Sequence, residues 1–129
     1  MSLSMTLSHQ FADFKLDLSL ETGPGITALF GRSGAGKTTI INAVAGLLRP
    51  GAGRIVIDGE VVLDTAKNIF VSAHKRRLGT VFQDARLFPH LTVAQNLSFG
   101  SRYAPKSSQG ASLQDVVSLL GLEDILGRR

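Results

Sequence analysis

The stretch Gly31-Arg32-Ser33-Gly34-Ala35-Gly36-Lys37-Thr38 matches the pattern G-x-x-x-x-G-K-[ST] at each of its fixed positions. The segment before it, residues 25–30, is apolar and predicts a short buried strand, and apolar residues recur at helical spacing from Ile40 to Leu48. A glycine-rich loop between a strand and a helix is the context in which this pattern binds phosphate. That context disfavours the alternative, a glycine-rich turn that matches by chance. We call residues 31–38 the phosphate loop.

The residue types of the phosphate loop suit the chemistry of an anion. Glycine tolerates positive φ and lets the backbone approach an anion, so we expect the amides from Gly34 to Thr39 to converge on phosphate oxygens. The start of the following helix adds unpaired N–H groups and the positive end of its dipole. Lys37 is expected to reach the β and γ phosphates, and the Thr38 hydroxyl to bind Mg²⁺, which prefers oxygen ligands. The candidate nucleotide-binding residues of this region are Gly31, Ser33, Gly34, Ala35, Gly36, Lys37, Thr38 and Thr39.

The composition is that of one ordinary globular domain. The chain has 129 residues, of which 43% are hydrophobic, and it contains no cysteine, which excludes disulfides and thiolate chemistry. No apolar stretch is long enough to cross a bilayer and no signal peptide is evident, so we expect a soluble, intracellular chain. Residues 1–4 precede a second methionine, Met5, a candidate natural start, and we leave them out of the fold prediction.

The net charge of +4 raises the question of a nucleic-acid partner. The basic residues are scattered, apart from Lys75-Arg76-Arg77 and Arg128-Arg129, only 6% of the residues are aromatic, and there is no stacking motif. We therefore expect no nucleic-acid binding. The basic cluster at residues 75–77 is assigned to a solvated face or to an anionic partner.

Antiparallel elements are predicted on both sides of the phosphate loop. Residues 5–20 alternate between apolar and polar and predict a half-buried antiparallel strand. Arg49-Pro50-Gly51 is expected to end the loop helix. Residues 54–57 and 60–63 flank Asp58-Gly59, a dipeptide typical of a type I′ hairpin. This mixture argues against a purely parallel sheet.

Several shorter elements are predicted in the second half of the chain. Ser72 is expected to cap a helical turn, and residues 78–82 to form a buried strand that ends at Gln83. Thr92 is the predicted N-cap of a helix through Phe99. Ser112 is the predicted N-cap of a second helix, which ends at Gly121. The polar residues 101–111 between these helices are expected to form a surface linker.

The phosphate loop, followed downstream by Val81-Phe82-Gln83-Asp84, resembles the ATP-binding subunits of ABC transporters over nearly the whole chain. The resemblance implies an α/β fold, a P-loop NTPase of the ABC-ATPase type, with an N-terminal antiparallel β subdomain and the start of a helical subdomain. Its sheet would be incomplete in this chain. Residues 5–64 would hold the antiparallel elements, the phosphate loop and its helix, residues 65–90 the Q-loop strand region, and residues 91–129 the start of the helical subdomain.

The same resemblance implies further site residues. Gln83 matches the family's Q-loop glutamine, whose amide approaches Mg²⁺ and the attacking water. That match makes Gln83 a catalytic and metal-binding candidate beside Lys37, although a lone glutamine at a strand end is usually a surface residue. The family stacks an aromatic ring on adenine, and Phe11 is the best positional match, with Phe14 as its neighbour. Both can equally be strand or core residues.

Residues Leu87 and Phe88 follow the Q-loop match and are expected to form an exposed groove for a helix of a membrane subunit. The alternative is that both are core residues. No Cys or His lies at ligand spacing from His90, so we expect His90 to be structural, and His74, beside Lys75, to be solvated.

Within the family, residues 75–90 look most like the ATPase of molybdate importers, although sulfate, polyamine and sugar importers share much of this segment. The resemblance implies ATP hydrolysis, with ATP and Mg²⁺ as cofactors, that powers uptake of molybdate or a related oxyanion. The implied partners are transmembrane permease subunits, contacted through residues 83–88, a second ATPase subunit and, indirectly, a substrate-binding protein. The implied location is peripheral, on the cytoplasmic face of the inner membrane.

The family's Leu-Ser-Gly-Gly signature, its Walker B aspartate with the catalytic glutamate, and its switch histidine do not occur up to Arg129. We therefore expect the first part of an ATPase, inactive by itself, with an unpaired sheet edge that makes it unstable or prone to aggregate. Two alternatives stay open. One is another P-loop enzyme, such as a small-molecule kinase, and the other is a non-catalytic nucleotide-binding module.

Overall fold

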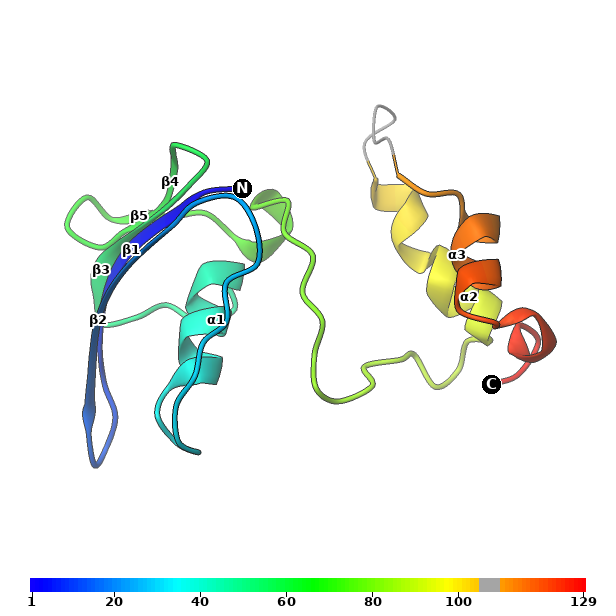
Figure 1. The fold of residues 1–129 in the computed structure, drawn as a ribbon, viewed down its shortest axis with the longest axis horizontal. Helices are drawn as coiled ribbons and strands as arrows, with labels where there is room; N and C mark the ends of the chain where they lie inside the picture. Colours follow the sequence, from blue (N-terminus) through cyan, green and yellow to red (C-terminus); the bar gives the residue numbers. More distant parts are fainter. Residues whose placement is uncertain (105–109) are drawn as a thin grey trace. The chain divides into compact units, whose positions relative to one another are not determined.

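The computed structural model describes residues 1–104 and 110–129. These residues form two compact units, Met1–Thr80 and Val81–Arg129, shown in Figure 1. The linker expected at residues 101–111 falls in part on residues 105–109, outside the described residues. Within the described ranges, every helix is too short or too polar to cross a membrane.

A five-stranded antiparallel sheet forms the framework of the first unit (Figure 1). Its strands are β1 (Leu3–Gln10), β2 (Lys15–Thr22), β3 (Ala52–Ile57), β4 (Glu60–Asp64) and β5 (Ile69–Phe70), in the spatial order β2-β1-β3-β4-β5. The single strand predicted over residues 5–20 is therefore wrong: residues 11–14 turn the chain back, and the alternating pattern covers two paired strands. Leu3 and Ser4, which the prediction left out, belong to β1 and pair with Thr22 and Glu21 of β2.

Helix α1 (Lys37–Ala45) covers one face of this sheet (Figure 1). Ile40 and Ala43 of the helix pack in one apolar cluster with residues of β1, β3 and β4, namely Met5, Leu7, Ile55, Ile57, Val62 and Leu63. The helix ends earlier than the predicted stop at Arg49-Pro50-Gly51. Gly46, with φ 77°, forms a left-handed cap, and its N–H donates to the carbonyls of Ala43 and Asn42.

The predicted hairpin between β3 and β4 is confirmed. Asp58 and Gly59 adopt φ values of 47° and 82°, as a type I′ turn requires. Ser72 precedes the short 3₁₀ helix η1 (Ala73–Lys75) as predicted, but its side chain makes no cap hydrogen bond. The Asp58-Gly59 turn thus forms as its sequence predicts, whereas the predicted side-chain cap by Ser72 does not form.

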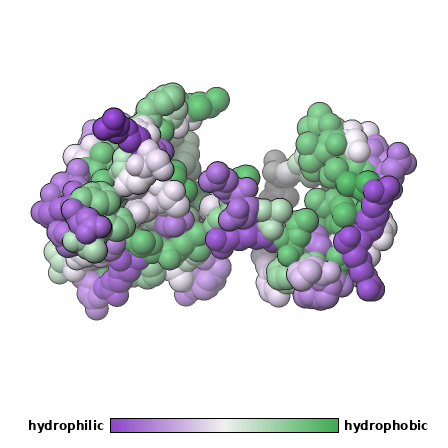
Figure 2. Space-filling model, turned by 90° about the horizontal axis from the view of Figure 1, so that it is seen from below, coloured by the Kyte–Doolittle hydropathy of each residue, from purple (hydrophilic) through white to green (hydrophobic). Residues whose placement is uncertain are grey.

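Two predicted strands do not form. Residues 25–30 and 78–82 are irregular, and side chains expected in the core are open, with Ile26 103%, Phe30 93% and Val81 98% exposed. A strand persists only where a neighbour takes up its backbone hydrogen bonds, and the described sheet pairs neither segment. Figure 2 shows hydrophobic areas on the surface of the molecule.

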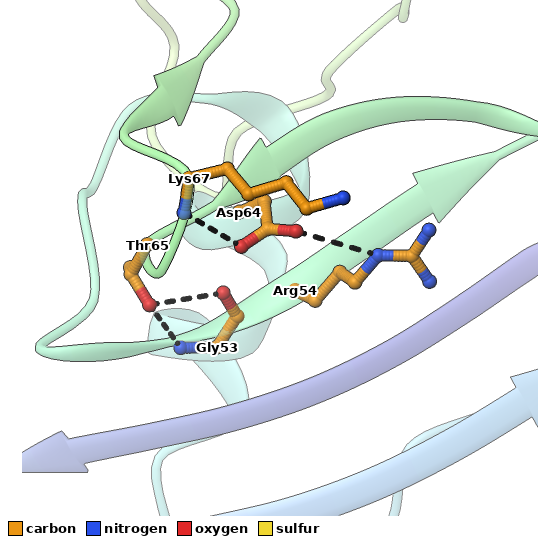
Figure 3. A network of polar contacts seen from close by, with 5 residues as sticks. All are labelled: Gly53, Arg54, Asp64, Thr65 and Lys67. Atoms are coloured by element: carbon orange, nitrogen blue, oxygen red, sulfur yellow. Dashed lines mark hydrogen bonds and ion pairs between the residues drawn. The ribbon is translucent and has the colours of Figure 1, made fainter.

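A polar network fastens β3 to the end of β4 (Figure 3). Thr65 Oγ1 accepts a hydrogen bond from Gly53 N at 3.0 Å and donates one to Gly53 O at 3.2 Å. The Asp64 carboxylate accepts a bond from the backbone N–H of Lys67 at 3.2 Å and pairs with Arg54 at 3.6 Å. Asp64 is only 6% exposed. This buried carboxylate is therefore engaged in holding the sheet together.

The second unit is helical, with α2 (Val93–Ser98), the 3₁₀ helix η2 (Phe99–Tyr103), α3 (Leu113–Leu119) and η3 (Glu123–Ile125). The predicted caps are confirmed. Thr92 Oγ1 accepts from Gln95 N at 3.3 Å, and Ser112 Oγ accepts from Asp115 N at 3.1 Å. Gly121, with φ 61°, follows the end of α3 as predicted.

Candidate functional site

The phosphate loop leads directly into α1, as its sequence predicts. Gly34 and Gly36 adopt φ values of 80° and 84°, in the left-handed region that glycine permits. Gly36 is the N-cap of α1, where no side chain accepts a cap hydrogen bond and the first turn contains no acidic residue. Residues 31–35 are exposed. The loop is therefore open to solvent, and among the described residues no side chain caps the start of α1.

The first backbone N–H groups of α1 are unsatisfied. Within the described part of the chain, no acceptor takes the amides of Lys37, Thr38 or Thr39, and the first regular bond runs from Ile40 N to Gly36 O at 3.0 Å. Helix N-termini carry such donors together with the positive end of the dipole. The prediction for residues 34–39 needs one correction, because the amide of Ala35 donates to Arg32 O at 3.2 Å.

The start of α2 is a useful comparison, because its amides are all satisfied. Val93 N donates to Arg128 O at 2.8 Å and Ala94 N to Leu126 O at 3.0 Å. The next amide, of Gln95, donates to the Thr92 hydroxyl. The chain thus supplies acceptors for the first amides of α2. The first amides of α1 stay available to an external acceptor.

Lys37 curls back over the phosphate loop. Its Nζ donates to Gly31 O at 2.8 Å and to Arg32 O at 2.7 Å. These two loop carbonyls hold the ammonium group within the phosphate loop. The loop therefore combines a held cation with free N–H donors, a combination that attracts a multiply charged anion.

Leu16 of β2 supports the phosphate loop from the sheet side, and the sequence analysis missed it. A Cβ placed on Gly36 would lie 3.0 Å from Leu16 Cδ2. Glycine is therefore favoured at position 36 for two reasons: its positive φ, and the lack of room for a Cβ beside Leu16. The only sequence signal was the place of Leu16 in an alternating strand, which does not reveal a partner twenty residues away.

Phe11 lies in the turn between β1 and β2. Its ring stacks on Phe14 with a centroid distance of 4.5 Å and an interplanar angle of 11°, and it meets His9 edge-on at 4.9 Å. The Phe11 N–H donates to Phe14 O at 2.8 Å. Both aromatic candidates thus occupy one small cluster, shortly before Leu16 in the sequence. Stacking of Phe11 on adenine stays a prediction.

The two candidate Mg²⁺ ligands are both exposed. Thr38 stands in the first turn of α1, and within residues 1–104 and 110–129 its hydroxyl has no hydrogen-bond partner. Gln83 belongs to the second unit, and its side chain has no hydrogen-bond partner among the described residues. No group of three or more His, Asp or Glu side chains suited to a metal ion occurs within residues 1–104 and 110–129. Metal binding by Thr38 and Gln83 also stays a prediction.

The apolar pair after Gln83 is open to solvent, with Leu87 65% and Phe88 39% exposed. Phe88 packs on Phe99 with ring centroids 4.4 Å apart. Asn96, which the sequence analysis missed, organises this loop. Its Oδ1 accepts from Phe88 N at 2.8 Å, while its Nδ2 donates to Phe88 O at 3.2 Å and Leu91 O at 3.3 Å. The exposed face at Leu87 and Phe88 is therefore held in place.

The basic cluster at residues 75–77 is not uniformly solvated, contrary to the expectation. Lys75 and Arg77 are exposed, whereas Arg76 is 6% exposed. Burial lowers the pKa of Arg76. Sequence alone could not separate these neighbours, because the acceptors that bury Arg76 lie elsewhere along the chain.

Comparison with known proteins identifies relatives across the whole chain. Residues 14–129 match the family described as ABC transporter. The chain is 48% identical over 129 residues to the "Molybdenum import ATP-binding protein ModC" of Mesorhizobium japonicum, and the alignment covers 100% of this chain and 35% of that protein. Other relatives with this name are 42% to 50% identical. The chain therefore spans about a third of the length of the curated relatives it matches.

Solved structures with a similar fold were also found. A bacterial Atm1-family ABC exporter with ATP bound is 29% identical, with a TM-score of 0.68, over 99% of this chain and 22% of that chain. A dimeric post-hydrolysis state of the ATP-binding cassette MJ0796, bound to ADP and Pi, is 20% identical, with a TM-score of 0.65, over 100% of this chain and 61% of that chain. At that identity the second likeness concerns the fold alone.

Proposed function

Because the chain belongs to the ABC transporter family, we propose that it binds ATP together with Mg²⁺ through the phosphate loop and the start of α1. The family match confirms the resemblance that the phosphate loop and Gln83 indicated, and the structural neighbours confirm the expected fold class. The observation that carries the proposal is the set of unsatisfied amides at residues 37–39, together with the ammonium group of Lys37 held by carbonyls of the same loop.

The residues present fit a triphosphate. Lys37, Thr38 and Thr39 supply free N–H donors at the positive end of α1, where an anion is stabilised. Gly31, Ser33, Gly34 and Ala35 form the exposed backbone around them, and Gly36, which is partly buried, leads into the helix. Lys37 Nζ would exchange the carbonyls of Gly31 and Arg32 for the β and γ phosphate oxygens. In this proposal Lys37 acts by holding charge where it develops during phosphoryl transfer.

Two side-chain oxygens would hold the metal ion. The Thr38 hydroxyl and the Gln83 amide oxygen are hard ligands of the kind that Mg²⁺ prefers. Bound Mg²⁺ would offset the charge of the β and γ phosphates. Gln83 would in addition orient the attacking water, which is the role that its match to the family implies.

The adenine would stack on the aromatic cluster in the β1–β2 turn. Phe11 is the proposed contact, and Phe14 is the alternative because the two rings already stack on one another. The contact of Leu16 with Gly36 supports this assignment, since it ties the strand that follows the turn to the phosphate loop. Stacking is tolerant of geometry, so a modest rearrangement of these rings is sufficient.

Lys37→Ala tests the proposal directly. In the full chain we expect the Kd of a fluorescent ATP analogue with Mg²⁺ to rise at least about tenfold, because charge-assisted bonds to phosphate are lost. Lys67→Ala is the matched control, since Lys67 is exposed and uses only its backbone N–H in the polar network. Unchanged affinity in Lys37→Ala, or an equal loss in Lys67→Ala, would contradict the proposal.

We further propose that the chain is part of an ATPase that powers uptake of molybdate or a related oxyanion. The support is that relatives 42% to 50% identical to this chain are molybdenum import ATP-binding proteins. Deletion of the gene should abolish uptake of radiolabelled molybdate and leave sulfate uptake unchanged; the opposite pattern would refute the choice of substrate.

By itself the chain should bind ATP without turnover, because the family's Walker B and switch residues do not occur within these residues.

The proposed partners follow from the same membership. The face formed by residues 83–88 would meet transmembrane permease subunits, since it is exposed, partly apolar and braced by Asn96. A second ATPase subunit would complete the nucleotide site, as membership of the ABC transporter family implies. A substrate-binding protein would act indirectly. These partners would place the ATPase at the cytoplasmic face of the inner membrane, as a peripheral subunit.

A further inference from the structure

Arg76 is a buried cation that no carboxylate accompanies in the described part of the chain. Its side chain is 6% exposed. Burial lowers its pKa, but a guanidinium keeps its proton in proteins. A buried charge is costly unless hydrogen bonds offset the loss of water. Here every hydrogen-bond partner is a backbone carbonyl.

Arg76 caps the C-terminal end of α1 from far along the chain. Its Nη1 donates to Ala43 O at 2.7 Å and to Val44 O at 2.8 Å. The last carbonyls of a helix have no partner within it, and they carry the negative end of its dipole. The last turn of α1 contains no basic residue of its own. Arg76 therefore supplies the positive charge that this helix end lacks.

The same guanidinium also binds the sheet. Its Nε donates to Val71 O at 2.7 Å, and its Nη2 donates to Val62 O in β4 at 3.4 Å. The ring of Phe70 in β5 lies 5.2 Å from the guanidinium carbon, within range of a cation–π attraction. One side chain thus joins α1 to β4, to β5 and to the segment that follows β5.

Gly46 makes room for this arrangement. With φ 77° it forms the left-handed cap of α1, and a Cβ at this position would lie 2.6 Å from Arg76 Nε. A side chain at residue 46 would therefore displace the guanidinium from the helix end. The glycine and the arginine form one unit, which we call the α1 clamp.

We propose that Arg76 is a positioning residue for the phosphate loop: by holding the C-terminal end of α1 against the sheet, it sets where the N-terminal end presents Gly36 and Lys37. The inference rests on the proposed nucleotide binding. Helix α1 has nine residues and is about 13 Å long, so Arg76 acts at a distance and does not touch the nucleotide. A rigid helix passes a tilt at one end to the other, and phosphate binding depends on the exact place of that end.

Four variants of the full chain separate this role from general stability. Arg76→Lys keeps the charge but loses the planar fork, and Arg76→Met removes both. Arg77→Met is the neighbouring control, because Arg77 is exposed. Ile57→Ala is the stability control. Ile57 belongs to the apolar cluster in which α1 packs on the sheet, but it makes no hydrogen bond to the C-terminal end of α1.

Three quantities are measured on each variant: the thermal midpoint, amide hydrogen exchange over residues 37–45, and the Kd of a fluorescent ATP analogue with Mg²⁺. Binding is measured at a temperature where circular dichroism shows the variant folded. Both Arg76 variants should raise the Kd about tenfold and speed exchange in α1. Arg77→Met should change neither. Ile57→Ala should lower the midpoint and leave the Kd near its original value.

Gly46→Ala keeps the test decisive if the Arg76 variants do not fold. It retains the arginine but obstructs the clamp, so the Kd should rise in the same way. Folded variants of either residue with an unchanged Kd would overturn the inference, as would an equal loss of affinity in Ile57→Ala. If the unsubstituted chain binds no analogue, the proposed function fails and the inference falls with it. If it binds and its Kd is insensitive to the clamp, only the inference fails.

Discussion

At the scale of single residues, the positive-φ glycines of the phosphate loop differ in how crowded they are. Gly34 has φ 80° and no atom within 4 Å of an added Cβ, whereas a Cβ on Gly36, with φ 84°, would meet Leu16 at 3.0 Å. The motif pattern requires glycine at position 36 and leaves position 34 unspecified. The structure adds a steric requirement at Gly36 alone, because only there does a strand from outside the loop touch it.

This difference predicts that Gly34→Ala and Gly36→Ala lower the free energy of unfolding by different amounts. Gly34→Ala should reduce the free energy of unfolding by about 1 kcal/mol, the cost of forcing a left-handed conformation on a residue with a Cβ. Gly36→Ala should cost more, because Leu16 must also move. Urea unfolding measures both. In a double-mutant cycle, Leu16→Ala should remove the extra cost of Gly36→Ala, and equal costs for the two glycines would count against the contact.

At the scale of elements, α1 differs from α2 and α3 in how its first turn is satisfied. Both later helices have capping boxes built from Thr92 with Gln95 and from Ser112 with Asp115. Helix α1 has neither a side-chain cap nor an acidic residue in its first turn. Its start is therefore less stable than it could be, as expected of a helix whose N-terminus binds an anion.

An acidic residue in the first turn of α1 should raise the stability of the chain and weaken its binding of the nucleotide. Thr38→Asp places a negative charge in the first turn of α1 and should raise the stability of the nucleotide-free chain by about 0.3–1 kcal/mol. The same charge should repel phosphate and raise the Kd of an ATP analogue. Thr38→Asn is the control of equal shape without the charge. Thermal unfolding and a binding titration measure the two effects, and tighter binding by Thr38→Asp would contradict the assignment of this helix end.

At the scale of the whole molecule, the chain exposes apolar segments that a strand pattern would bury. Ile26 is 103% and Phe30 is 93% exposed in the first unit, and Val81 is 98% exposed in the second. Large exposed apolar areas in a soluble chain mark contact surfaces or promote association. The broad hydrophobic areas in Figure 2 are consistent with this expectation.

The exposed apolar side chains predict that the purified chain binds hydrophobic dyes and self-associates. It should bind the dye ANS and self-associate at micromolar concentration, and Ile26→Ser combined with Phe30→Ser should reduce both. Thr27→Ser, between the two on the same exposed segment, is the control and should change neither. Light scattering and ANS fluorescence provide the measurements. A chain that neither binds ANS nor associates would show that these side chains are covered in solution.

The features that the sequence determined by itself are local ones. The start of a helix directly after Gly36, the Asp58-Gly59 turn and the caps Thr92 and Ser112 were predicted correctly, because each depends on φ preferences or on hydrogen bonds a few residues apart. The family could also be recognised, since its motifs are short and contiguous.

Only the tertiary structure decided the rest. Arg76 and Arg77 are neighbours of the same type, yet carbonyls of α1 and β4 bury the first and leave the second in water. Leu16 touches Gly36 because β2 folds back beside the loop. Residues 25–30 and 78–82 have strand-like sequences but no paired neighbour among the described strands. In each case the outcome depends on groups distant in sequence, and a local pattern carries no information about where they lie.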